Sequence, residues 1–266
     1  QNQFLKEWFV YRFIMIWKKR MWNESQILYF LLDMKLAVMQ PYFMPYISYW
    51  QLIKVVDTFV FYDDVNFIKR GYVNRNNILV NGNSSMFTIP LIKSSQNRLI
   101  KDIEISYAED WIEKLLRNLV YNYKKAPFFD EVYSLIESQL NIRYNKISKL
   151  NIGITKLICS YLGINTNFLI SSELLIGTKK KGQERILEIG RFLNANHYIN
   201  PVGGREIYAQ ELFSENEIIL NFIISDSSIS YNQLKNEFVP WLSMIDVLMF
   251  NSVVEVNDLL KKFKLN

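Results

Sequence analysis

Paired carboxylates and a cluster of cations lie close together in the first third of the sequence. Asp63 and Asp64 end an apolar run, and a basic, amide-rich stretch follows at once, containing Lys69, Arg70, Asn74, Arg75, Asn76 and Asn77. Carboxylates can exchange protons, and cations and amides can hold an anion. The stretch therefore predicts a site that binds an anion and performs proton chemistry. The alternative is that the carboxylates cap a turn and the cations form a solvated face, and composition alone leaves both open.

Two apolar runs position these side chains. Residues 36–39 precede Gln40, a loop of Tyr, Phe and Pro leads into a predicted helix over residues 47–56, and a second run over 58–62 ends at the carboxylates. This order predicts a strand, loop, helix, strand unit. Ligands of open α/β sheets bind at the carboxyl ends of the strands, where both Gln40 and the carboxylate pair fall. We expect an α/β fold with a Rossmann-like, mostly parallel sheet.

A second unit of the same kind lies near residue 200. A predicted helix over residues 183–193 precedes a strand over 197–199, the loop Asn200-Pro201-Val202-Gly203-Gly204, a helix from about 205 and a strand over 218–224. Glycines before a helix can present backbone N–H groups to phosphate or carboxylate, although the same residues also form ordinary turns. His197 is the only histidine, so an imidazole base active at neutral pH must be this residue. The alternative is a histidine that is satisfied within a strand.

The middle and the end of the chain complete the expected fold. Strands are predicted over residues 86–91 and 99–106, and helices over 109–125, 130–140 and 146–162, which together suggest a helical insertion at about 109–163. Cys159 lies among apolar helical neighbours and is expected to pack in the core. Asp246 is the only charge in an apolar stretch over 241–254, where it either caps a structure or serves a site.

Composition limits the partners and metals. The chain of 266 residues has a net charge of +5 and is 50% hydrophobic, and its one tight basic run, at 179–181, is interpreted as a solvated loop. We therefore expect no nucleic-acid partner. One histidine and one cysteine argue against a structural metal, while Mg²⁺ held by Asp63 and Asp64 is a further option.

The first thirty-three residues differ from the rest. Their apolar part is too short and interrupted to span a membrane, and no secretory cleavage site follows it. We interpret residues 1–33 as a poorly packed extension, with Met34 as the natural start, and residues 34–266 as a single α/β domain that is cytoplasmic.

Four separated motifs resemble the WbqC-like protein family. They are MKLAVMQPYFMPYISYWQLI, DTFVFYDDVNFIKRGYVNRNNIL, HYINPVGGREIY and WLSMIDVLMFN, and the resemblance runs from Met34 to the C-terminus. It implies a role in bacterial surface polysaccharide (O-antigen or capsule) biosynthesis, where the family is linked to acyl or aminoacyl transfer, including glycyl transfer, to an amino sugar. The partners so implied are a nucleotide-linked sugar and an activated acyl or aminoacyl donor.

The residues can be assigned roles in such a transfer. His197 would be the base, Asp63 or Asp64 would hold the amine or orient the base, and Gly203 and Gly204 would donate to an oxyanion or a phosphate. The other expected binding residues are Gln40, Asn74, Asn200, the cations Lys69, Arg70 and Arg75, and a wall of Tyr42, Phe43, Tyr46 and Tyr49. The competing interpretations are a non-catalytic ligand-binding or scaffold protein of a polysaccharide assembly complex, and a hydrolase using the same acids.

Overall fold

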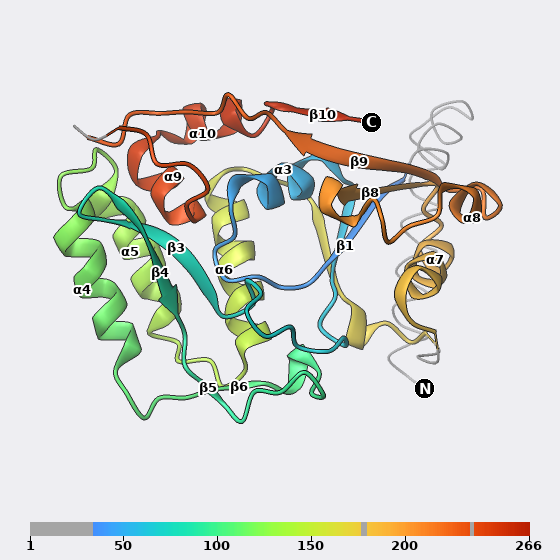
Figure 1. The fold of residues 1–266 in the computed structure, drawn as a ribbon, viewed down its shortest axis with the longest axis horizontal. Coiled ribbons are helices and arrows are strands. Elements are labelled where there is room, and N and C mark those ends of the chain that lie inside the picture. The colour runs from blue at the N-terminus through green and yellow to red at the C-terminus, as the bar shows by residue number, and fades with distance from the viewer. Residues whose placement is uncertain (1–33, 177–179, 235–236) are drawn as a thin grey trace, which may run out of the picture.

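A six-stranded sheet runs through the protein. The computed structural model describes residues 34–176, 180–234 and 237–266. The strand order is β10-β9-β8-β1-β2-β7, and every neighbouring pair is parallel except β9 and β10 (Figure 1). The strands are β1 (Lys35–Met39), β2 (Thr58–Phe61), β7 (Asn167–Ile170), β8 (His197–Pro201), β9 (Ile219–Ser225) and β10 (Phe263–Leu265). The predicted Rossmann-like, mostly parallel sheet is confirmed.

The central strands are buried on both faces. Successive side chains of a strand point to opposite faces. Accordingly, Ala37 and Phe59 join the larger core cluster, while Leu36, Val38 and Val60 join a smaller cluster on the other face. The helix α3 (Ile47–Val55) packs in the larger cluster, and α7 (Gly182–Phe192) contributes to the smaller one. Continuous apolar runs are typical of parallel strands covered in this way.

The order of the strands reverses beside β1. From β1 the chain adds β2 and then β7 on one side, and it returns to add β8 and β9 on the other side. The carboxyl ends of β1 and β8 therefore flank the point where the connections diverge. In open α/β sheets this point is the usual ligand crevice, because the loops on its two sides turn away from each other.

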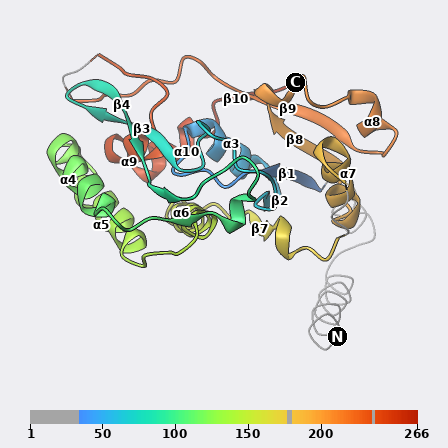
Figure 2. The ribbon, with the colours of Figure 1, turned by 60° about the horizontal axis from the view of Figure 1, so that its bottom comes forward.

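The helical part lies at the end of the molecule opposite α7 and α8 (Gln210–Ser214), as Figures 1 and 2 both show. The predicted helices occur as α4 (Trp111–Tyr123), α5 (Phe129–Leu140) and α6 (Ile147–Tyr161). A hairpin of β3 (Arg75–Val80) and β4 (Asn83–Thr88) packs with them. The helices α9 (Met244–Phe250) and α10 (Val253–Leu259) precede the C-terminal strand.

Two expected elements differ from the structure. The strand expected over 99–106 is instead a 3₁₀ turn (Ile100–Asp102) and the two-residue strand β6 (Glu104–Ile105), which pairs with β5 (Leu91–Ile92). The backbone N–H of Asp102 donates to the carbonyl of Leu99 at 3.0 Å, which closes the turn. The helix expected from about 205 is replaced by a 3₁₀ turn (Val202–Gly204) and the later helix α8.

Two predictions concern residues outside the described part. The interpretation of residues 1–33 as an extension lies wholly outside it, and so does Lys179 of the basic run. Within the described ranges, no helix is both long and apolar enough to cross a membrane.

Candidate functional site

Gln40 lies directly after β1, at the point where the strand order reverses. The backbone N–H of Tyr62 donates to the carbonyl of Met39 at 2.8 Å, and the hydroxyl of Tyr49 donates to the backbone carbonyl of Gln40 at 2.9 Å. These bonds hold the backbone of Gln40 next to the end of β2. Its side-chain oxygen Oε1 is buried and has no hydrogen-bond partner among the described residues. Such an orphaned acceptor at a ligand crevice calls for an explanation.

Asp63 joins the carboxyl end of β2 to that of β7. It is only 4% exposed. Its Oδ1 accepts from the Ser172 N–H at 3.1 Å and lies 3.2 Å from Ser171 Oγ, and its Oδ2 accepts from Ser172 Oγ at 2.9 Å. Burial raises the pKa of Asp63, and the bonds from the serines act against that rise. Both oxygens are occupied, so Asp63 mainly fastens two strand ends together.

Asp64 faces a buried arginine that sequence reasoning missed. Arg185 of α7 places Nη2 3.4 Å from Asp64 Oδ2 and Nη1 2.8 Å from Glu188 Oε2, and only 3% of its side chain is exposed. Ser171 Oγ also donates to Asp64. A buried guanidinium is tolerated only with close anionic partners. The only sequence signal was a cation beside the apolar stripe of an amphipathic helix.

Tyr62 adds a hydroxyl to this group. Burial, followed by the nearby Asp64 charge, raises the pKa of Tyr62 to about 12, and Arg185 lowers it in part. The phenol therefore stays protonated at neutral pH and can donate a hydrogen bond. Tyr198 belongs to β8, and its hydroxyl lies 3.3 Å from Asn200 Oδ1 and 3.4 Å from the Val38 carbonyl. These tyrosines place hydroxyls beside the carboxyl ends of β2, β1 and β8.

The loop after β8 contains a close approach of side chain and backbone. Asn200 is 5% exposed, and a Cβ atom added to Gly204 would lie 1.9 Å from its Nδ2 atom. Gly203, in contrast, has open space where a Cβ would stand. The sequence predicted a helix beginning near Arg205, whose N-terminus could bind an anion, and that helix is absent. The N–H of Arg205 donates to the Val202 carbonyl and closes a single 3₁₀ turn instead. Asn200 nevertheless lies near the carboxyl end of β8, the strand that pairs with β1.

His197 is at the other end of the sheet. It is the first residue of β8, and it pairs in register with Lys35 and Ile219, the first residues of β1 and β9. Five residues of strand separate its backbone from the carboxyl edge by about 13 Å. Its Nε2 contacts Asn221 Oδ1. The structure therefore does not bring His197 to Asp63 and Asp64, and it places this imidazole at the start of a strand in contact with Asn221.

The expected aromatic wall divides into core and surface residues. Phe43 and Tyr49 are buried, at 1% and 4% exposed, and Phe43 packs against Phe87 at a ring distance of 6.3 Å. Tyr42 is half-buried with its ring 6.2 Å from that of Tyr72, and the ring of Tyr46 lies 4.9 Å from that of Trp241, tilted by 46°. Only Tyr42 and Tyr46 retain surface that a ligand could contact.

The basic loop is internally braced. Arg75 Nε donates to the Gly71 carbonyl at 3.0 Å, its Nη2 donates to the Arg70 carbonyl, and Asn74 Nδ2 donates to the Ile89 carbonyl at 2.8 Å. The N–H of Phe43 donates to the Tyr72 carbonyl at 3.0 Å, which joins this loop to the loop after β1. Lys69 and Arg70 are exposed. They are the two cations of the loop that can receive an anion.

The carboxylates offer little room for a divalent ion. All four oxygens already accept hydrogen bonds, those of Asp63 from Ser172 and those of Asp64 from Ser171 and Arg185. Within the described ranges, no three His, Cys, Asp or Glu side chains gather as a metal site would require. Mg²⁺ would have to displace the guanidinium of Arg185 from Asp64, so the donor set does not fit this ion.

Comparisons with known proteins cover most of the chain. The family model described as the WbqC-like protein family matches residues 40–258, which begin at Gln40 and include every candidate residue above. An uncharacterized protein of Mycobacterium tuberculosis, Rv1507c, is 31% identical over 229 residues, covering 85% of this chain and 97% of the relative. No solved structure matches the chain.

Proposed function

The chain belongs to the WbqC-like protein family, and from this membership we propose that it transfers an acyl or aminoacyl group, such as glycyl, to the amine of an amino sugar. We assign the reaction to the carboxyl edge of the sheet. The acceptor is proposed to be nucleotide-linked and destined for a bacterial surface polysaccharide, the setting that the family resemblance implies. The second substrate is an activated acyl or aminoacyl donor.

The observation that carries this proposal is the orphaned Oε1 of Gln40. A buried acceptor without a donor costs about 1–3 kcal/mol, and this one lies where an open α/β sheet binds its ligand. An N–H donor from a ligand removes that cost. The amine of an amino sugar supplies such a donor, and the carboxylate of Asp64, which follows the adjacent strand β2, favours a ligand that carries a positive charge or a proton to give up.

Asp64 is the proposed proton acceptor. Its side chain is 10% exposed and accepts from one serine hydroxyl and from the guanidinium of Arg185, whereas Asp63 is only 4% exposed. The amine nitrogen would form a bond to the acyl carbon, Asp64 would take the amine proton, and the leaving group would depart with the electron pair of its bond to the acyl carbon. Tyr62, protonated at neutral pH, is the proposed donor to the oxyanion. Lys69 and Arg70 are proposed to hold the diphosphate.

A second candidate is a ligand-binding protein of a polysaccharide assembly complex that does not turn over. The observation that favours it is the position of His197, which leaves the carboxyl edge without an imidazole among the described residues. Asp64 would then hold the amine of a bound sugar through charge alone. Both candidates use the same pocket residues and differ only in the fate of the proton.

Thermal-shift measurements test the binding half of the proposal. Nucleotide-linked amino sugars should raise the melting temperature, and the matching nucleotide sugars with hydroxyl in place of amine should raise it much less. Saturation a hundredfold above Kd adds about 2.7 kcal/mol. Gln40→Leu removes the acceptor at similar volume and should abolish the preference, while Gln40→Glu, which keeps an acceptor, should retain it. Equal shifts from both sets of sugars would contradict the role of Gln40.

Turnover separates the two candidates. Wild-type protein should form an amide from an amino sugar nucleotide and an activated acyl donor, and Asp64→Asn should lose turnover while it keeps the thermal shift. Glu188→Gln is the matched control, because it neutralises the other carboxylate on Arg185 without touching the edge. Binding with no product across thioester and aminoacyl-adenylate donors would favour the non-catalytic candidate.

A further inference from the structure

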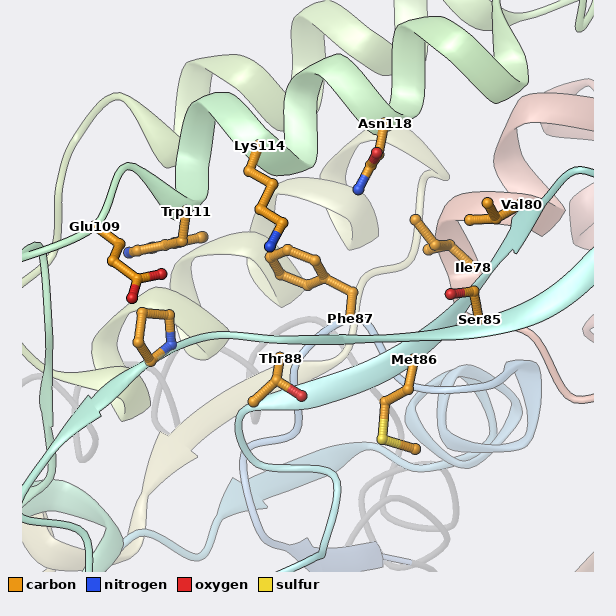
Figure 3. Close-up of a pocket in the computed structure, with 11 residues that line it drawn as sticks. Ile78, Val80, Ser85, Met86, Phe87, Thr88, Glu109, Trp111, Lys114 and Asn118 are labelled. Carbon is orange, nitrogen blue, oxygen red and sulfur yellow. The ribbon is translucent and has the colours of Figure 1, made fainter.

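A groove separates the β3–β4 hairpin from α4, away from the sheet edge described above. Its volume is about 390 Å³. Figure 3 shows Phe87 rising from the hairpin and Lys114 and Asn118 descending from α4 toward it, with Trp111 at one end. Phe87 and Trp111 place their ring centroids 6.3 Å apart and form the apolar floor. The groove is bounded along one side by β4, the outer strand of the hairpin.

The outer edge of β4 carries unpaired backbone groups. The Asn77 carbonyl accepts from the Ser243 N–H at 2.8 Å, and the Leu79 N–H donates to the Tyr123 hydroxyl at 2.7 Å, so the outer edge of β3 is covered. The polar backbone groups of Asn77 and Leu79 thus point away from β4.

In an antiparallel ladder, residue pairs that exchange hydrogen bonds alternate with pairs that do not. Asn77 and Leu79 belong to pairs that do not, so the hydrogen-bonded residues of β3 are Asn76, Ile78 and Val80. On β4, the partners in register are Phe87, Ser85 and Asn83. The backbone groups of Ser84, Met86 and Thr88 consequently face outward. No hydrogen bond to them occurs within the part of the chain that the structure describes.

Two side chains in the groove also lack partners. Trp111 is 4% exposed, yet its indole N–H meets no acceptor among the described residues. Lys114 is exposed and forms no ion pair within the same ranges, while Glu109 supplies the one carboxylate, at the Trp111 end of the groove. The groove therefore offers a buried donor, a free cation and an apolar floor. An occupant needs an acceptor, a negative charge and an apolar side chain to match.

We propose that an extended peptide of a partner protein pairs with the outer edge of β4 and lies in this groove. The peptide backbone satisfies Ser84, Met86 and Thr88, as in strand addition to an exposed edge. One of its apolar side chains rests on Phe87 and Trp111. An acidic side chain reaches Lys114 from the same face of the peptide.

An extended backbone is favoured because only it presents alternating N–H and C=O groups at the spacing of a strand. A small ligand would leave most of the edge unpaired. A second copy of this chain pairing through β4 is disfavoured by charge. The strand sequence Asn-Ser-Ser-Met-Phe-Thr contains no carboxylate for Lys114.

Panning a phage-displayed library of random dodecapeptides on the full chain tests the proposal. Enriched peptides should alternate an apolar and an acidic residue on one face. A synthetic copy of the strongest peptide should slow amide hydrogen exchange at Ser84, Met86 and Thr88 and leave the carboxyl edge of the sheet unchanged. This measurement needs no variant and reads the edge directly.

Substitutions at the edge and in the groove give the matched controls. Met86→Pro removes an outward N–H without touching the bonds to β3, and it should weaken the peptide at least about tenfold. Met86→Thr keeps the N–H and should bind within about twofold of wild type. Lys114→Glu should lose acidic peptides, and Trp111→Phe should weaken binding by removing the indole N–H. Lys114→Glu and Trp111→Phe test the groove even if Met86→Pro does not fold.

Three outcomes would overturn the proposal. Panning could enrich no sequence above background, or the selected peptide could bind Met86→Pro and Lys114→Glu as tightly as wild type. Sedimentation could instead show a dimer of the wild-type chain that Met86→Pro separates, which would assign the edge to self-pairing. Exchange protection confined to some other surface would also reject the groove as the binding site.

Discussion

Asp246 and Asp64 are both enclosed carboxylates, but their surroundings are built differently. Asp246 is fully buried, and it accepts from Tyr231 at 2.6 Å, from Gln233 at 2.7 Å and from Tyr123 at 2.9 Å. Every one of these donors is neutral. Asp64 is paired with the cationic Arg185, and part of its side chain is open to solvent.

The difference separates a carboxylate that holds parts of the fold together from one that faces a cation and remains partly open to a ligand. The Tyr123 hydroxyl, which donates to Asp246, also accepts from the Leu79 N–H, so the carboxylate connects α9 with α4 and the hairpin. At the sheet edge Asp63 is held by neutral donors of Ser172, whereas Asp64 meets Ser171 and the cationic Arg185 of α7. We infer that hydrogen-bond saturation by neutral donors distinguishes a structural acid from a candidate site acid better than burial alone.

The largest effect is expected from Asp246→Ala. It removes the common acceptor of three buried or half-buried donors, and we expect a loss of about 3–5 kcal/mol in the free energy of unfolding. Asp64→Ala should cost less, about 1–3 kcal/mol, because the buried Arg185 keeps Glu188 as a partner. Urea denaturation of the two variants measures both values. Equal losses would remove the distinction between the two acids.

Next in size is the effect of a methyl group at the loop after β8. Gly204→Ala would bring a Cβ to 1.9 Å from Asn200 Nδ2, so Asn200 must move. We expect a loss of about 1–3 kcal/mol and weaker binding of amino sugar nucleotides. Gly203→Ala is the matched control, since nothing lies within 4 Å of its added methyl group. Thermal melts with and without ligand should leave this control near wild type.

A smaller effect concerns pH. Burial raises the pKa of Asp246, which the three donors lower only in part, so the folded protein keeps this proton to a higher pH than the unfolded chain. The contribution of Asp246 to stability is therefore present at low pH and is lost as pH rises from about pH 4 through the folded-state pKa. Asp246→Asn cannot titrate there. The free energy of unfolding of wild type minus that of Asp246→Asn should fall with rising pH and then level off, and a rising difference would contradict the raised pKa.

Much of the fold followed from local patterns. Continuous apolar runs identified β1 and β2, apolar spacing identified α4, α5 and α6, and the ends of the runs correctly located Gln40, Asp63 and Asp64 at one edge. The weak points were short segments. Residues 99–106 alternate well enough for a strand, but the chain closes a 3₁₀ turn at Ile100–Asp102.

The sequence alone does not show which side chains contact Asp63 and Asp64 in the site. Arg185 meets Asp64 only because α7 packs over the smaller core cluster, more than a hundred positions along the chain, and no local pattern encodes that docking. The sequence also does not show that Ser172 would occupy both oxygens of Asp63 and that Ser171 would donate to Asp64. These contacts depend on the order in which parallel strands assemble, which is a tertiary property.

The smallest effect is expected at His197, and it tests the two ends of the sheet against each other. Parallel strands share one direction, so the first residue of a strand lies at the amino edge however close it is in sequence to a loop at the other edge. His197→Asn should therefore change amide formation and amino sugar binding by less than about twofold, and should cost only about 1 kcal/mol through its contact with Asn221. Rates of product formation at saturating acceptor, compared with Asp64→Asn, measure this. A loss as large as that of Asp64→Asn would mean that the reaction does not take place at the carboxyl edge.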